Sequence, residues 1–287
     1  MTKFTRPARI SSTKLKMDKD LSIIVTSYKN PTVLKLCLES LKKNIFELDY
    51  DIHVMDSAAE EDTEMMMRED FPEFQYHPFA ENVGFGYLVN QGIKRSNGHY
   101  VLVLNADIIV EKKAVNLLLE HLKKNPEIGL IGPKLLNFDG HLQYSCFRFY
   151  TPLVILLRRT FFGRLKSARR RVDDFLYKNF DHDKIIEADW IMGSAMMTSR
   201  NALKNIGLIV EDFFMYFEDV DWCRRFWENN LKVVYFPYAR MFHYHGKGSA
   251  SRNVFGAVLF NHLTRNHIRS AAKYFWKYLG KPNPHIV

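Results

Sequence analysis

The feature that most limits the fold of this chain is a regular alternation of apolar strand segments and amphipathic helical segments in its first half. Strand-type runs rich in β-branched and aliphatic residues occupy 21–26, 51–55, 74–77, 100–104 and 128–131. Helical patterns of apolar residues lie between consecutive runs. This alternation predicts an α/β fold, in which a mainly parallel mixed sheet is flanked by helices.

Polar residues stand at the carboxyl ends of three of these predicted strands. They are Thr26, Asp56 and Asp107. Ligands of open α/β sheets bind in the crevice outside the carboxyl ends of the strands. The topology alone therefore predicts that these three side chains share one ligand-binding rim.

The second half of the chain has a less regular pattern. Residues 147–185 mix aromatic, aliphatic and basic side chains, and we expect a long loop or an amphipathic interfacial segment there. Strands are predicted over 190–198 and over 232–236, the second one ended by Pro237. A basic, aromatic helix is predicted over about 254–278. We find no internal repeat.

The turn Asn105-Ala106-Asp107 follows the most apolar predicted strand. A carboxylate at this position suits Mg²⁺ or Mn²⁺, because these hard cations prefer oxygen ligands. The bound metal would neutralise charge on a leaving phosphate. The alternative interpretation is an aspartate that only caps the next helix.

An acidic cluster, Glu218, Asp219 and Asp221, lies between aromatic residues. Three carboxylates so close together repel one another and need a metal, an arginine or a helix N-terminus nearby. Arg224 and Arg225 are close enough in sequence to pair with them. One carboxylate is a candidate general base that deprotonates a hydroxyl. A helix-start cluster stabilised by the helix dipole is the alternative.

Two histidines, His243 and His245, follow the last predicted strand. They face opposite sides if the segment is extended, so only one of them would point into the site and bind the metal. A structural role is the alternative for each. The glycines and Ser249 after them are typical of a loop that folds over phosphates.

The net charge of +9 is unevenly distributed, with seven lysines and arginines between 158 and 171. Such a patch attracts the phosphates of a nucleic acid, a nucleotide or an anionic lipid, or forms a solvated basic face. No apolar run reaches the roughly 18 residues of a spanning helix. With three widely spaced cysteines and no apolar leader, we expect a cytoplasmic protein with free thiols, soluble or peripheral on the inner face of the cell membrane.

Several of these segments resemble one known family. The strings SIIVTSY, VMDS, NVGFG with NQG, LNAD, DWIMGSA and FFMYFEDVD occur in this order between residues 21 and 250. Together they are similar to the inverting family 2 glycosyltransferases, and most closely to their rhamnosyltransferase-like bacterial branch. The string FFMYFEDVD at 213–221 is the strongest single match. In the metal motif, Asn105 stands where the family has aspartate.

The resemblance implies a GT-A fold, in which a nucleotide-binding half is fused to an acceptor-binding half. Residues 20–140 would form the nucleotide-sugar-binding half and 141–250 the acceptor-binding and catalytic half. A basic tail at 1–19 and a basic aromatic C-terminal helix within 251–287 would flank them.

The resemblance also implies roles for the acidic residues and the histidines. Asp219 would be the general base, with Glu218 beside it positioning the acceptor or the base. Asp107 would bind the metal, helped by His243 or His245; the spacing does not decide which one.

The remaining implied roles concern the two substrates. Thr26 and Asp56 would contact the nucleobase. The other predicted nucleotide-sugar contacts are Tyr28, Asn82, Gly84 and Asn105, and the predicted acceptor contacts are Trp190, Gly193 and Asp221.

The sequence thus predicts a metal-dependent, inverting hexosyltransferase that uses Mn²⁺ or Mg²⁺. Its donor would be a dTDP- or UDP-sugar carrying rhamnose or another hexose, and its acceptor a hydroxyl of a lipid-linked glycan or polysaccharide. An anionic membrane surface is a further expected partner, while no nucleic acid is expected. The alternative is a non-catalytic module that binds membrane or nucleic acid through the basic patches. A dinucleotide-dependent dehydrogenase is excluded, because the first strand is not followed by the glycine fingerprint.

Overall fold

A computed structural model describes residues 17–159, 165–244 and 262–285. Its main sheet has ten strands, with the order β3-β2-β1-β4-β11-β6-β12-β5, while β7 pairs with β6 and β9 with β12; β8 and β10 form a separate pair. The strands of the first half are β1 (Lys19–Tyr28), β2 (Tyr50–Ser57), β3 (Gln75–Phe79), β4 (Gly98–Asn105), β5 (Ile108–Val110) and β6 (Ile128–Leu136). Those of the second half are β7 (Leu142–Gln143), β8 (Cys146–Phe147), β9 (Ile186–Glu187), β10 (Trp190–Ile191), β11 (Ala195–Ser199) and β12 (Lys232–His243).

Parallel pairing organises the first half of this sheet. Strand β1 pairs in parallel with β2 and with β4, and β2 pairs in parallel with β3. Strand β11 then joins antiparallel to β4 and β6, so that the second half of the chain is built into the same sheet. The predicted mainly parallel mixed sheet is confirmed.

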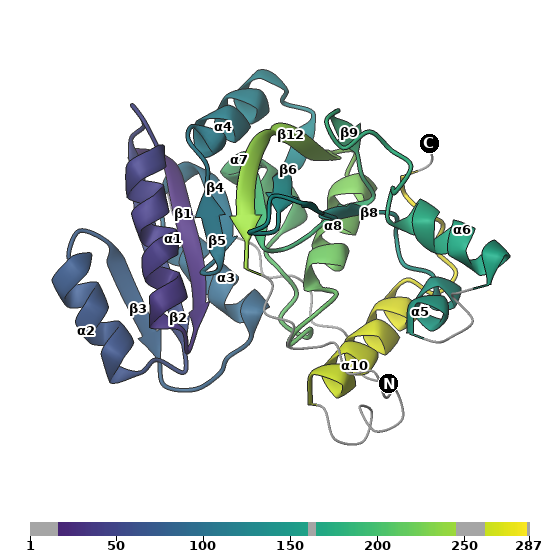
Figure 1. Ribbon diagram of the computed structural model, residues 1–287, viewed down its shortest axis with the longest axis horizontal. Coiled ribbons are helices and arrows are strands. Elements are labelled where there is room, and N and C mark those ends of the chain that lie inside the picture. Colours follow the sequence, from purple (N-terminus) through teal and green to yellow (C-terminus); the bar gives the residue numbers. More distant parts are fainter. Residues whose placement is uncertain (1–16, 160–164, 245–261, 286–287) are drawn as a thin grey trace.

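Helices cover both faces of the sheet (Figure 1). They are α1 (Pro31–Asn44), α2 (Glu61–Asp70), α3 (Phe85–Arg95), α4 (Ala114–Lys124), α5 (Pro152–Arg159), α6 (Lys166–Phe175), α7 (Arg200–Ile206), α8 (Glu218–Glu228) and α10 (His262–Lys277). Alternate side chains of β1 enter different layers. Ile23 packs with apolar residues of α1 and α4, and Ile24 packs with residues of α3, α7 and α8. This two-layer core fixes the carboxyl edge of the sheet.

Three sequence-based predictions for the second half are corrected. Strand β12 does not stop before Pro237 but continues to His243, with a register shift between Phe236 and Arg240 that accommodates the proline. The predicted strand over 190–198 is two strands in different sheets, β10 and β11. The segment 147–185 holds the helices α5 and α6, which excludes the predicted long loop and leaves the alternative of an amphipathic segment.

The ends of the chain are described only in part. Helix α10 is described from His262, and the predicted residues 251–261 before it lie outside the described ranges, as does most of the predicted basic tail. The three cysteines are free thiols in buried positions, as expected. Across the described ranges, no helix combines the length and the apolar character needed to cross a bilayer.

Candidate active site

A cleft of about 640 Å³ opens at the carboxyl edge of the sheet. Strand ends, the loop before α3, the loop before α8 and helix α10 all contribute to its walls. Its lining includes Thr26, Ser27, Tyr28, Ser57, Asn82, Gly84, Phe85, Asn105, Asp107, Phe214, Met215, Tyr244 and Asn266. The structure therefore brings together the residues that the sequence predicts to contact a nucleotide sugar, with the exception of Asp56.

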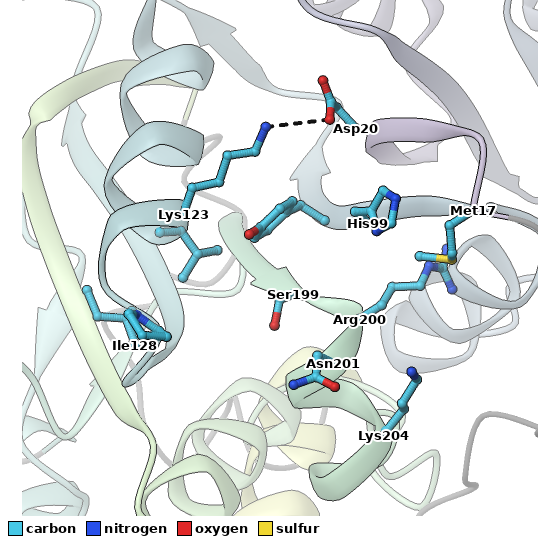
Figure 2. A pocket seen from close by; sticks show the side chains of 12 residues that line it. Met17, Asp20, His99, Lys123, Ile128, Ser199, Arg200, Asn201 and Lys204 are labelled. Carbon is cyan, nitrogen blue, oxygen red and sulfur yellow. Dashed lines mark ion pairs between the residues drawn. The ribbon is translucent and has the colours of Figure 1, made fainter.

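A second cavity, of about 470 Å³, lies at the opposite edge, where β1, β4 and β6 begin (Figure 2). Two of its basic side chains, Arg200 and Lys123, are engaged within the protein. The guanidinium of Arg200 donates hydrogen bonds to the carbonyl oxygens of Gly98 and Ile93, both at 2.8 Å. Lys123 pairs with Asp20 at 3.5 Å. The candidate site is therefore the cleft at the carboxyl edge, as open α/β sheets favour.

Asp107 lies beside His243 at one end of the cleft. Strand β12 pairs antiparallel with β5, and the Tyr244 N–H donates to the Asp107 carbonyl at 2.9 Å. This pairing places His243 Nε2 3.3 Å from Asp107 Oδ1. His243 Nδ1 lies 3.0 Å from Gln143 Oε1; with its proton on Nδ1, the ring would donate to this oxygen and keep the Nε2 lone pair for a metal.

The pair Asp107 and His243 fits a divalent cation, because a carboxylate oxygen and an imidazole nitrogen both suit Mn²⁺. In the ranges that the structure describes, no group of three or more His, Cys, Asp or Glu side chains gathers as a metal cluster. Two protein ligands leave coordination positions for the oxygens of a diphosphate. The other candidate, His245, lies outside the described residues.

Asp56 lies at the end of β2, next to the cleft residue Ser57. The hydroxyls of Tyr76 and Ser27 both interact with the buried Asp56 carboxylate, and the Tyr76 hydroxyl donates to Oδ2 at 2.9 Å. Burial raises the pKa of Asp56. A buried acceptor oxygen of this kind fits the imide N–H of a pyrimidine base.

The acidic loop carries Asp219 at the start of α8. Tyr216 and Phe217 both adopt left-handed backbone conformations, each with φ 70°, which turns the chain sharply before the helix. Asp219 Oδ2 accepts the Gly193 N–H at 3.0 Å, and Oδ1 accepts the Val220 N–H at 2.8 Å. Burial raises the pKa of Asp219 to about 6 and outweighs these two hydrogen bonds, which lower it.

Glu218 is buried beside Asp219, and its Oε2 has no hydrogen-bond partner among the described residues. Burial, together with the charge of Asp219, raises the pKa of Glu218 to about 8. Both carboxyl groups therefore ionise less readily than free ones, and the pKa of Glu218 lies above that of Asp219. Such a separation assigns different acid and base roles to two neighbouring carboxyl groups.

A two-residue bridge connects the metal side of the cleft to Asp219. The Asn105 N–H donates to the Ser194 carbonyl at 2.9 Å, while the preceding residue, Gly193, donates its N–H to Asp219. A Cβ at Gly193 would lie 3.3 Å from Asp219 Oδ2 and 3.5 Å from the ring of Phe85, which lines the cleft. Gly193 thus lies between Asp219 and the cleft residue Phe85, while Asp219 and Glu218 themselves lie behind the residues that line the cleft.

None of the three predicted acceptor residues, Trp190, Gly193 and Asp221, lines the cleft. Asp221 is 0% exposed, and its carboxylate is bound by Arg225 at 3.0 Å, by the Tyr278 hydroxyl at 2.8 Å and by Lys277. The prediction that Asp221 contacts the acceptor is therefore wrong, because no face of this carboxylate is open. Trp190 is buried, and its ring stacks on Phe147 at a centroid distance of 4.4 Å.

Three further cleft or supporting residues were not predicted from the sequence. Gln143 orients His243, and Phe214 and Asn266 line the cleft. Gln143 lies in a two-residue strand, Phe214 in a run of aromatic residues and Asn266 in a basic helix. No local sequence pattern marks these residues as part of a site. Only the tertiary structure reveals their positions.

The sheet order, the cleft at the carboxyl edge and the acidic pair near it match the GT-A class of α/β fold. The chain belongs to glycosyl transferase family 2, whose sequence pattern matches residues 22–225. The matched range runs from β1 into α8 and contains Thr26, Asp56, Asp107 and Asp219. His243 and helix α10 lie beyond it.

Curated relatives of the chain act in glycan assembly, as their names state. It is 28% identical over 218 residues to a low-salt glycan biosynthesis hexosyltransferase of Haloferax volcanii, covering 75% of this chain and 64% of that protein. It is 23% identical over 235 residues to an N-acetylglucosaminyl-diphospho-decaprenol L-rhamnosyltransferase of Mycobacterium tuberculosis, covering 78% of this chain and 76% of that protein. The match thus spans less than two thirds of the length of the haloarchaeal relative.

Two solved structures share the fold. GalNAc-T7 with UDP, GalNAc and Mn²⁺ superposes with a TM-score of 0.60 at 14% identity, over 88% of this chain and 48% of that chain. The mannosyltransferase PcManGT from Pyrobaculum calidifontis, in complex with GDP-Man and Mn²⁺, gives a TM-score of 0.55 at 15% identity, over 94% of this chain and 67% of that chain. At these identities the likeness concerns the fold alone.

Proposed function

We infer that this protein is an inverting hexosyltransferase that transfers a sugar from a pyrimidine nucleotide donor to a hydroxyl of a glycan acceptor. The observation that carries this proposal is the bridge at Gly193 and Ser194. It holds the ionisable Asp219 and the turn of Asp107 on one side of the molecule. Proton removal at one point and diphosphate binding at another are the two tasks of a glycosyl transfer in one displacement.

Asp219 is the proposed general base. With its pKa raised to about 6, it is ionised at neutral pH and still basic enough to take a proton from an attacking hydroxyl. The Gly193 N–H holds Oδ2 in place, which limits the motion of the carboxylate. The raised pKa of Glu218 beside it disfavours a second negative charge in the site.

Asp107 and His243 are the proposed ligands of a divalent cation, which would stabilise the departing diphosphate when bound. The structural neighbours named above were solved with Mn²⁺. Thr26, Asn82, Gly84 and Asn105 would contact the nucleotide sugar from the walls of the cleft.

The donor is proposed to carry uracil or thymine. The acceptor oxygen of Asp56 fits the imide N–H of these bases, and Tyr28, an exposed aromatic residue of the cleft, offers a ring for stacking. The likeness to an L-rhamnosyltransferase and to a hexosyltransferase of glycan biosynthesis supports a hexose and a glycan acceptor. The lipid-linked form of the acceptor follows from the name of the mycobacterial relative alone.

The second candidate function is a non-catalytic module that binds an anionic surface. The exposed arginines of α6 favour it. This function does not explain the raised pKa values of Glu218 and Asp219 or the cleft at the carboxyl edge. It is therefore the less well supported of the two functions.

A donor panel tests the proposal. The full chain is incubated with UDP- and dTDP-hexoses and a glycan acceptor, with and without Mn²⁺, and the release of nucleoside diphosphate is measured. We expect metal-dependent release with a pyrimidine donor. Asp219→Asn should lower the turnover number by about 10³-fold while donor affinity stays unchanged.

Asp174→Asn, on the exposed face of α6, is the matched control and should keep full activity. Normal turnover of Asp219→Asn would exclude this residue as the base. Metal-independent release, or a preference for GDP-sugars, would refute the assignments at Asp107 and Asp56 respectively.

A further inference from the structure

Helix α10 connects the cleft to an outer surface of the molecule. On its inner side, Asn266 lines the cleft, and Tyr274 is buried against the aromatic core. The Ser270 hydroxyl donates to the Met215 carbonyl at 2.9 Å, and Lys273 bonds to the Asp212 carbonyl. Helix α10 is therefore packed on the loop that leads to Asp219.

The outer side of the same helix carries large apolar side chains in the open. Ile268 is 46%, Trp276 67% and Leu279, just after the helix, 75% exposed. They alternate with two exposed arginines and an exposed alanine at helical spacing. We call this set the α10 stripe, and it consists of Arg265, Ile268, Arg269, Ala272, Trp276 and Leu279.

Exposed apolar and basic side chains also lie around the α10 stripe. In Figure 1, α5 and α6 lie at the same end of the molecule as α10. The three segments border one aromatic cluster, because Phe217 contacts both Tyr150, just before α5, and Tyr274 of α10, with centroid distances of 4.9 and 5.4 Å. Further exposed residues in this region are Leu153, Leu156, Leu165, Arg169, Arg170 and Arg171.

We propose that the α10 stripe docks this protein on an anionic lipid bilayer. Large apolar side chains flanked by arginines on a single helix face match the chemistry of a membrane interface. There, apolar groups enter the acyl boundary and cations meet lipid phosphates. Arg265 and Arg269 are both exposed, so their guanidinium groups are accessible to an anion outside the protein.

Docking by this stripe has a consequence for the substrate, which rests on the proposed transferase function. The helix that lies on the bilayer also lines the cleft on its other side. A helix with its side chains is roughly 10–12 Å thick, so the cleft lies about that far from the lipid headgroups. Docking by the stripe would therefore bring the cleft within reach of a sugar that is attached to a membrane lipid.

The residues of the stripe favour a bilayer over other occupants. A nucleic-acid surface would present aromatic rings for stacking among the cations, but the stripe has one aromatic ring and two aliphatic side chains. A second copy of the chain would place the same arginines against each other, because a two-fold interface is self-complementary.

Trp276 makes the docking directly observable. The other three tryptophans are enclosed, Trp190 and Trp222 within the core and Trp227 against His285. The full chain is mixed with phosphatidylcholine vesicles, with or without phosphatidylglycerol. We expect co-sedimentation and a blue shift of tryptophan emission only with the anionic vesicles, both weakening as salt is added.

Substitutions separate the contribution of the arginines to vesicle binding from that of the apolar side chains. Arg265→Gln with Arg269→Gln should lower the vesicle partition constant by roughly 25-fold, about fivefold for each cation. Trp276→Ser should lower it by about tenfold, because its ring no longer enters the apolar boundary. The matched controls are Tyr238→Ser, an aromatic residue that is 61% exposed on β12, and Lys184→Gln. Neither should change the binding, and all variants should keep the melting temperature of the parent.

Several results would overturn the proposal: no binding to anionic vesicles, equal losses in the controls, displacement from vesicles by RNA, or a dimer that dissociates in the Trp276→Ser variant. Nucleoside diphosphate release with a water-soluble acceptor distinguishes this failure from that of the transferase function. Transfer without vesicle binding removes only the docking, and vesicle binding without transfer for any donor removes only the enzyme assignment.

Discussion

The two halves of the molecule hold their site residues in different ways. In the first half, Thr26, Ser57 and Asn105 lie at the ends of parallel strands, so the backbone of the sheet places them on one rim. In the second half, the site residues depend on side-chain contacts with distant segments. Asp219 is held by Gly193, 26 positions away, and His243 by Gln143, 100 positions away.

This difference indicates which site residues keep their positions when surrounding residues are substituted and which do not. A ligand rim made of strand ends persists as long as the sheet forms, whatever its side chains are. A base or metal ligand held by remote side chains requires residues that never touch the substrate. Substitutions outside the cleft should therefore have larger consequences in the second half than in the first.

The largest expected effect that tests this contrast is at Asp221. Asp221→Asn removes the anion between Arg225 and Lys277, and leaves two buried or half-buried cations without compensation. We expect the free energy of unfolding to fall by about 3 kcal/mol. Chemical denaturation at neutral pH measures this loss.

The matched substitution in the first half is Asp56→Asn. Since burial raises the pKa of Asp56, its ionised form is already disfavoured in the folded protein, and an amide there should cost less than about 1 kcal/mol. If both substitutions destabilise the protein equally, the two halves do not differ in the way described here.

The second largest effect is expected at Gln143. Gln143→Ala removes the acceptor of the His243 Nδ1–H, so the imidazole loses its fixed orientation and tautomer. Residues that orient a metal ligand typically contribute 10- to 100-fold to affinity, and we expect Mn²⁺ binding to weaken by about that factor. Titration of free Mn²⁺ by electron paramagnetic resonance in the presence of UDP gives the dissociation constant.

Two further variants make this result specific. Gln143→Glu keeps an acceptor oxygen and should retain the affinity. His141→Ala removes an exposed histidine from the same loop and should leave it unchanged. Unaltered Mn²⁺ binding in Gln143→Ala would show that His243 does not need this contact.

Local patterns predicted most of the first half correctly, because strand and helix periods are set by neighbouring residues. They failed at β12, where a register shift beside Pro237 lets the strand continue. They also failed at α6, where the buried side chains are only Ala168 and Phe175 and the basic residues hide the helical pattern.

The acidic cluster shows the same limit within the site. Asp219 and Asp221 are two positions apart at a helix start, so they point about 200° apart around the helix. The sequence gives no sign of which one faces the cleft. Lys277 and Tyr278, more than 50 positions later, bind the Asp221 carboxylate, whereas Asp219 is bound by Gly193.

The smallest of the expected effects, tenfold per pH unit, concerns the acidic pair itself. A base works only when ionised, and burial raises the pKa of Asp219 to about 6. We therefore expect kcat/KM to fall about tenfold per unit below pH 6 and to stay level between pH 7 and 8. Because burial and not the charge of Glu218 raises this pKa, Glu218→Gln should leave the acid limb in place. If the acidic limb of the pH profile moves toward pH 4 in this variant, the charge of Glu218 raises the pKa of Asp219. The basicity of Asp219 would then depend more on its neighbour in sequence than on its contacts with distant residues.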